Sequence, residues 1–260
     1  MLKSNPIGFF DSGVGGLSVY SKFRDCLPNE NTLYFGDLAH LPYGNKTQSE
    51  LISYARTILN FYKKCNVKAV VIACNTSSAQ AYETIKDEFD FKIYPIIQSC
   101  AKIIANGDYN RIGVFATQAT VESGVYEKEL LKYNKNLKIC QMPCPNWVNI
   151  VENRFQDKDK DIELCMRKML DFSPDKVVLG CTHYPYLLGD LTKFAQRNLF
   201  IDPAEIFVNH IKEDLKMKNM CNESTIKGIE KFFVSAHPED FVKNSGIFYK
   251  IDTLPELVNL

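Results

Sequence analysis

The chain has 260 residues, which is longer than a typical domain of ~150 residues but too short for two large independent ones. Its 45% hydrophobic and 24% charged residues are ordinary globular values and exclude disorder as the dominant state. Thirty-one basic residues balance thirty-one acidic ones, and this zero net charge argues against nucleic acid or anionic lipid as a partner. The chain starts without a secretory signal and lacks the roughly 18 consecutive apolar residues of a membrane span, so we expect a soluble, cytoplasmic protein.

Strands and helices alternate in the first part of the chain. The apolar run 7–10 ends in a glycine-rich turn over 11–16, and a helical stretch begins at Leu17. The pattern then predicts a strand over 32–35, a loop over 36–46, a helix over 48–64, a strand over 69–73 and a helix over about 77–89. The run 69–73 is continuously apolar, which is typical of a parallel strand buried on both faces.

The series then restarts. The pattern predicts a strand over 111–115, a polar turn over 116–120, a helix over about 122–132 and a strand over 176–179. This last strand leads into Cys181 as the strand over 69–73 leads into Cys74. We interpret the repetition as an internal duplication, giving an α/β fold of two similar lobes with mainly parallel sheets. The lobes, 1–97 plus 207–260 and 98–206, are expected to be related by a pseudo-twofold axis, with the active site in the cleft between them.

The cysteines are the unusual feature of the composition. Nine is an odd number, and their scatter through a chain without an export signal favours reduced thiols. Cys74 and Cys181 end corresponding strands, so two thiols would approach one ligand from opposite sides. Removing a proton from one face of a carbon and returning one to the other face needs two such acid/base groups, and inversion of a stereocentre is that reaction.

Other interpretations of the cysteines stay open at this point. Both could be small core residues at strand ends, since most free cysteines are. A redox pair is disfavoured because neither residue lies in a Cys-x-x-Cys pattern. Cys140 and Cys144 are the closest pair, but no second pair at ligand spacing accompanies them, so we predict no metal site.

Polar residues at the predicted strand ends are candidates for binding a small ligand. His183 follows Cys181 by two residues and is suited to proton transfer or to adjusting the thiol's pKa. Asp11 and Ser12 follow the first strand, where they would bind an ammonium group or form a turn. The glycine turn lacks the full dinucleotide-binding spacing, because Ser18 occupies the place of the third glycine. Neutral hydrogen-bonding residues suited to a carboxylate are Asn75, Thr76, Thr117, Thr120 and Thr182.

Five segments together resemble the signature of the glutamate racemases, within the aspartate/glutamate racemase family. They are 10–19 (FDSGVGGLSV), 34–37 (YFGD), 42–44 (PYG), 73–76 (ACNT) and 180–185 (GCTHYP). By this resemblance Cys74 and Cys181 are the catalytic acid/bases, assisted by Asp11, Glu152 and His183. The substrate-binding residues that it implies are Asp11, Ser12, Tyr43, Gly44, Asn75, Thr76, Thr117, Thr120, Thr182 and His183.

The resemblance implies an isomerase that needs no cofactor and interconverts L- and D-glutamate, supplying D-glutamate for peptidoglycan and so for the cell wall and cell shape. Glutamate is the expected small-molecule partner, and a homodimer stays open. An aspartate racemase is the near alternative, although those enzymes typically carry a glutamate at the position of His183. A catalytically silent binding protein is the alternative from another class, and the presence of both cysteines counts against it. The chain departs from the family pattern at 96–100 and at Ala236, which leaves lobe orientation and regulation open.

Overall fold

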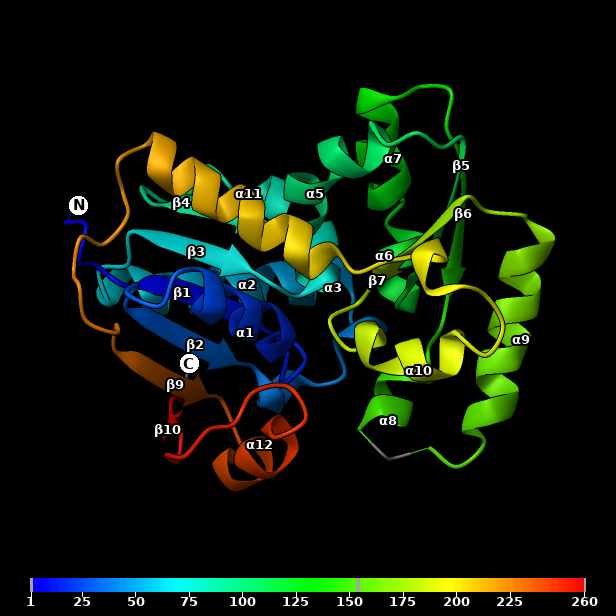
Figure 1. The fold of residues 1–260 in the computed structure, drawn as a ribbon. Helices are drawn as coiled ribbons and strands as arrows, with labels where there is room; N and C mark the ends of the chain where they lie inside the picture. Colours follow the sequence, from blue (N-terminus) through cyan, green and yellow to red (C-terminus); the bar gives the residue numbers. More distant parts are fainter. Residues whose placement is uncertain (1, 153–154, 260) are drawn as a thin grey trace.

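Two parallel β-sheets form the framework of the chain (Figure 1). The computed structural model describes residues 2–152 and 155–259. The first sheet has the strand order β10-β9-β2-β1-β3-β4, and the second has the order β6-β5-β7-β8. Every described strand pair is parallel, which confirms the predicted α/β fold with two sheets.

The two sheets share one arrangement of their central strands. The strands of the first sheet are β1 (Ile7–Asp11), β2 (Thr32–Gly36), β3 (Ala69–Ile72), β4 (Lys92–Pro95), β9 (Glu230–Val234) and β10 (Glu256–Leu257). Those of the second are β5 (Arg111–Ala116), β6 (Lys138–Pro143), β7 (Lys176–Gly180) and β8 (Phe200–Ile201). In each, the strand that comes first along the chain lies between the second and the third, as an internal duplication predicts.

Helices connect the strands and cover the sheets. In the first half of the chain they are α1 (Leu17–Cys26), η1 (Leu38–His40), η2 (Tyr43–Asn45), α2 (Gln48–Lys64), α3 (Asn75–Gln80), α4 (Tyr82–Ile85), α5 (Ile96–Ala105), α6 (Gln118–Glu122) and α7 (Val125–Tyr133). Then follow α8 (Trp147–Val151), α9 (Lys158–Asp171), η3 (Tyr184–Leu187), α10 (Leu188–Leu191), η4 (Arg197–Leu199), α11 (Pro203–Met217) and α12 (Pro238–Ser245). Within the described ranges, none of these helices has the length and hydrophobicity that a bilayer crossing requires.

The first sheet is buried on both faces. Phe9 packs in the apolar cluster that includes residues of α1 and α11, whereas its neighbour Phe10 packs with residues of α2 on the other face. The cluster around Phe9 continues into the second lobe, where it includes Phe115 of β5 and Trp147 of α8. One continuous apolar core therefore connects the two lobes.

Two predicted helices have different bounds in the structure. The helix expected over 77–89 begins at Asn75, directly after Cys74, and is divided at Ala81 into α3 and α4. The helix expected over 122–132 is α7, which begins only at Val125 because Gly124 before it has a left-handed backbone with φ 63°. Glycine adopts that conformation at little cost, so the chain changes direction there. Residues 118–122, of which 118–120 were predicted as part of a turn, form the short helix α6.

The segment after the second sheet returns to the first. Helix α11 packs against α1, α5 and β7, and β9 then pairs with β2 at the edge of the first sheet. In Figure 1 this returning segment runs in yellow, orange and red beside the blue strands. The predicted lobe boundaries fall inside α5 and α11, which contact one another, and their placement stays a prediction.

A buried ion pair and its hydrogen bonds connect the returning segment to the first part of the chain. The Lys68 ammonium contacts the Glu30 carboxylate at 2.5 Å, and the two side chains are 1% and 2% exposed. Lys68 also donates to the carbonyl of Met220, and the second Glu30 oxygen accepts from the amide of Asn222 at 2.7 Å. The pair therefore has nearly complete hydrogen bonding, which a buried pair requires.

Replacing Glu30 with alanine is expected to destabilise the protein strongly. The substitution leaves the Lys68 charge buried without its partner, which typically costs about 3–5 kcal/mol. Glu88→Ala is the matched control, because it breaks a surface pair with Arg56, N···O 2.7 Å, that solvent screens, so a much smaller loss of stability is expected. Urea unfolding followed by circular dichroism measures both, and equal losses of unfolding free energy would contradict the assignment.

Candidate active site

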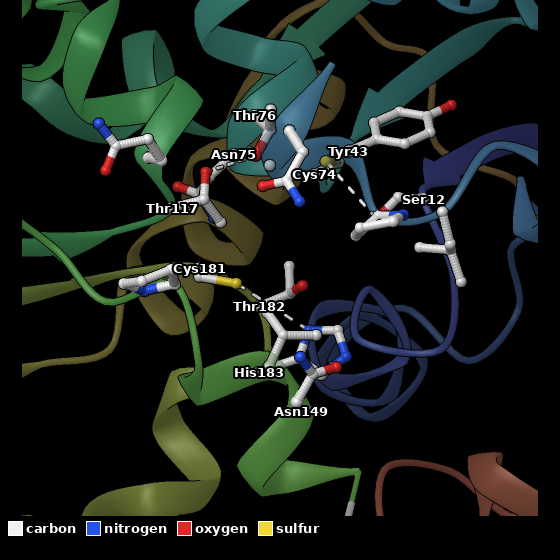
Figure 2. Close-up of a pocket in the computed structure, with 17 residues that line it drawn as sticks. Ser12, Tyr43, Cys74, Asn75, Thr76, Thr117, Asn149, Cys181, Thr182 and His183 are labelled. Atoms are coloured by element: carbon white, nitrogen blue, oxygen red, sulfur yellow. Dashed lines mark hydrogen bonds between the residues drawn. The ribbon is translucent and has the colours of Figure 1, made fainter. Parts of the chain in front are cut away.

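A cavity of about 100 Å³ lies between the carboxyl ends of the two sheets (Figure 2). Both lobes contribute side chains to it. The predicted residues that line it are Ser12, Tyr43, Gly44, Cys74, Asn75, Thr76, Thr117, Cys181, Thr182 and His183. Asp11, Thr120 and Glu152 are not part of the lining, and each contacts a residue that is.

Cys74 and Cys181 lie on opposite sides of this cavity (Figure 2). Cys74 follows β3 by two residues and Cys181 follows β7 directly, so each thiol is fixed at the end of a buried strand. They are 5% and 8% exposed. This placement suits a reaction in which a small molecule meets one sulfur on each face.

The Cys74 thiol is held in its neutral form. It contacts the Ser12 hydroxyl at 4.0 Å. Burial, together with the negative charge of Asp11, raises the pKa of Cys74 to about 12. At neutral pH, without a ligand, this residue is therefore a proton donor and not a thiolate.

Asp11 is a fully buried carboxylate behind the cavity wall. Its Oδ1 accepts from the amide of Gly13 at 3.0 Å, and its Oδ2 accepts from the Thr182 hydroxyl of the other lobe at 3.5 Å. Burial raises its pKa, although the His183 imidazole and these hydrogen bonds act in the opposite direction. Gly16 allows the close approach, because a Cβ there would lie 2.4 Å from the Asp11 Cβ.

Cys181 is the first member of a chain of three polar side chains. Its sulfur lies 3.9 Å from the His183 Nδ1, and the Nε2 of that ring lies 2.8 Å from a carboxylate oxygen of Glu152. Glu152 is the last residue before the undescribed positions 153–154 and follows α8. A carboxylate on one ring nitrogen fixes the orientation of the imidazole, so that its other nitrogen faces the thiol.

Hydroxyl groups join the lobes beside Cys74. The Thr76 Oγ1 lies 2.9 Å from that of Thr117, which lies 2.9 Å from that of Thr120. Thr120 is completely buried and so supports the two threonines that line the cavity. These are uncharged donors, suited to the oxygen atoms of a bound carboxylate.

The wall carrying Tyr43 and Gly44 rests on a second buried carboxylate. The Tyr43 hydroxyl donates to Asp37, which also accepts from Ser235 at 2.6 Å. Ser235 follows β9, so the returning segment supports this wall of the cavity. Burial raises the pKa of Tyr43 well above its ordinary value, so the phenol stays neutral and donates.

Several lining residues were not predicted as site residues from the sequence. They are Leu41, Pro42, Asn45, Gln118, Pro145, Val148 and Asn149. Pro42, Asn45 and Gln118 each adjoin a predicted residue along the chain, and that adjacency is the sequence signal that could have found them. The other four have no such neighbour. Among the described residues, no group of three or more His, Cys, Asp or Glu side chains could hold a metal ion. Cys144 is buried, and its carbonyl accepts from the Tyr184 hydroxyl at 2.8 Å.

Comparison with known proteins agrees with this geometry. A sequence profile of the Asp/Glu/hydantoin racemases matches residues 7–211. The chain belongs to this racemase family. A curated relative, the glutamate racemase of Thermoanaerobacter pseudethanolicus, is 37% identical over 249 residues, which are 94% of this chain and 93% of that protein.

Solved racemase structures have the same fold. The glutamate racemase from Francisella tularensis in complex with D-glutamate has a TM-score of 0.92 at 28% identity, covering 99% of each chain. The one from Thermus thermophilus in complex with β-chloro-D-alanine has a TM-score of 0.88 at 31% identity, covering 100% of this chain and 99% of that one. The predicted fold class is confirmed, and the chain is an isomerase of the racemase family.

Alkylation of Cys74 is expected to accelerate with pH over the whole range from 7 to 10. Only the thiolate reacts, and because the pKa of about 12 lies above this range, each pH unit should raise the rate about tenfold. The hydrogen bond from Cys144 lowers the pKa of Cys165, so the rate at that residue should level off at a lower pH. Iodoacetamide labelling resolved by peptide mass spectrometry measures both, and a plateau for Cys74 below pH 9 would refute the assigned environment.

Proposed function

We propose that this protein interconverts L- and D-glutamate by two-base proton transfer between Cys74 and Cys181, without a cofactor. The observation that carries the proposal is the placement of one buried thiol from each lobe on opposite sides of a single cavity. The relative at 37% identity, named a glutamate racemase, supports glutamate over aspartate as the substrate. The F. tularensis neighbour, solved with D-glutamate, supports the same choice.

The proposed reaction conserves its protons. One cysteine enters as a thiolate and takes the α-hydrogen of glutamate as a proton, while the electron pair of the broken C–H bond stays on the α-carbon. The thiol of the other cysteine then gives its proton to the opposite face of that carbon. The product is the other enantiomer, and the two sulfurs have exchanged protonation states.

The α-hydrogen of an amino acid is far less acidic than a thiol, so the cavity must stabilise the carbanion. Hydrogen bonds from Asn75, Thr76 and Thr182 to the α-carboxylate would place donors where negative charge develops. Asp11 is placed to attract the ammonium group through the cavity wall. The positive charge of that group also favours the ionised form of the Cys74 thiol, whose pKa burial raises.

The remaining assignments belong to the same proposal. His183, oriented by Glu152, would exchange the Cys181 proton. Ser12, Tyr43, Gly44 and Thr117 line the cavity and would contact substrate, with Thr120 as the support of Thr117. The D-glutamate formed would supply peptidoglycan synthesis. A cytoplasmic location and a homodimer stay predictions.

Replacing either cysteine with serine is expected to abolish racemisation almost completely. A hydroxyl is a much weaker acid than a thiol, and loss of one positioned acid/base typically costs about 10²- to 10⁴-fold in rate. Each variant, Cys74→Ser and Cys181→Ser, should also lose exchange of the α-hydrogen with D₂O chiefly for one enantiomer, and the two variants should differ in which one.

Polarimetry and NMR of L- and D-glutamate and aspartate, with no added cofactor, measure these rates. Cys65→Ser is the control, since Cys65 ends α2 outside the cavity. Wild-type protein that leaves glutamate optically unchanged would overturn the proposed function. Full racemisation by both cysteine variants would overturn the two-thiol mechanism alone.

A further inference from the structure

Tyr126 of α7 lies between the chain segments that carry the two cysteines. Its ring packs against Gly180, the residue before Cys181, where a Cβ would lie 2.9 Å from the ring carbon Cε2. Its hydroxyl donates to the Oδ1 of Asn75, the residue after Cys74, at 2.7 Å. Tyr126 is 2% exposed and comes from the second lobe, whereas Asn75 comes from the first. This side chain therefore contacts both halves of the proposed site.

The hydrogen bond leaves the other end of the Asn75 amide without a partner. A side-chain amide has one acceptor oxygen and a nitrogen that donates two hydrogen bonds. Tyr126 occupies the oxygen, and the Nδ2 is buried with no hydrogen-bond partner among the described residues. An unsatisfied buried donor is costly and calls for a ligand. Asn75 lines the cavity, so the acceptor that fits it is a carboxylate oxygen of the bound molecule.

We infer that Tyr126 is a positioning residue for substrate binding, because its hydroxyl fixes the Asn75 amide with the nitrogen directed to the substrate carboxylate. This inference rests on the proposed function. Without the hydroxyl, the amide is free to rotate and present its oxygen to the carboxylate, which repels it. Tyr126 acts through Asn75 and does not itself line the cavity.

The Tyr126 hydroxyl remains a donor throughout the working pH range. Burial raises its pKa well above the ordinary value for a phenol, so it does not ionise. The opposite lobe makes a corresponding contact, in which the Ser18 hydroxyl of α1 donates to the carbonyl of Thr182 at 3.1 Å. Ser18 follows β1, the first strand of its lobe, and contacts Thr182, the residue after Cys181. Tyr126 likewise follows β5, the first strand of the second lobe, and contacts Asn75, the residue after Cys74. The bond to Asn75 is thus one of two related contacts between the lobes.

Tyr126→Phe removes the hydroxyl and keeps the ring against Gly180. The KM for both glutamate enantiomers is expected to rise about tenfold, the scale of one buried hydrogen bond. The value of kcat should fall as well, because the misplaced Asn75 donor no longer faces the carboxylate on which negative charge develops. Tyr94→Phe is the matched control, because Tyr94 is equally buried and its hydroxyl donates to Asp214, away from the cavity. Its KM should equal that of the wild type.

A double-mutant cycle separates positioning from general support of the fold. Asn75→Ala should raise KM at least as much as Tyr126→Phe, and adding Tyr126→Phe to Asn75→Ala should change KM no further. A tyrosine with only a structural role would add its effect in both backgrounds. Circular dichroism and thermal unfolding check that each variant is folded.

The outcomes are distinct. An unchanged KM in Tyr126→Phe overturns the inference, and so does an equal further rise of KM in the double variant. In either case, racemisation by the wild type upholds the proposed function. If Tyr126→Phe does not fold, the Asn75→Ala variant tests the inference instead. An unchanged KM in Asn75→Ala would mean that Asn75 does not bind the substrate, and the inference would be overturned. A wild type inactive on glutamate would refute the proposed function itself.

Discussion

The two thiols belong to different lobes, so the geometry of the cleft depends on how the lobes contact each other. The contacts adjoin the cavity itself: Thr76 with Thr117, Asn75 with Tyr126, and Ser18 with Thr182. The continuous apolar core behind them adds rigidity. Under the proposed function, the proton donor and acceptor come from separate lobes, and proton transfer is sensitive to misplacement of about 1 Å, so the lobes must be held in a fixed relative position.

A further constraint on the site is the free-energy cost of burying charged groups in a closed cavity. Burial disfavours the ionised forms of both Asp11 and Cys74, and the surrounding donors are mostly neutral hydroxyl and amide groups. When no ligand is bound, the buried polar groups of such a site are incompletely hydrogen-bonded. Under the proposed function, the ammonium group of the bound glutamate supplies the positive charge that favours the ionised forms of these two acids, so binding and activation of the thiol become one event. The zero net charge of the chain is consistent with recognition by these local groups.

The sequence was most informative where strand ends determine position. Because the apolar residues of β3 and β7 lead directly toward Cys74 and Cys181, the convergence of the two thiols followed from the parallel fold. The short strands β8 and β10, and β9 with its charged first residues, have no comparable pattern. The contact of Tyr126 with Asn75 depends on the packing of one lobe on the other, which no local periodicity encodes. Glu152 was found only through the family resemblance.

The return of the chain to its first sheet has a consequence for synthesis on the ribosome. Strand β9 joins β2 only after every residue of the second sheet has been made. The second lobe therefore has all of its strands while the first still presents β2 as an open edge. The first lobe, although its synthesis begins first, can therefore complete its sheet only after the second lobe has been made. The hydrogen-bonded support beneath Tyr43 is complete only after Ser235 has been made.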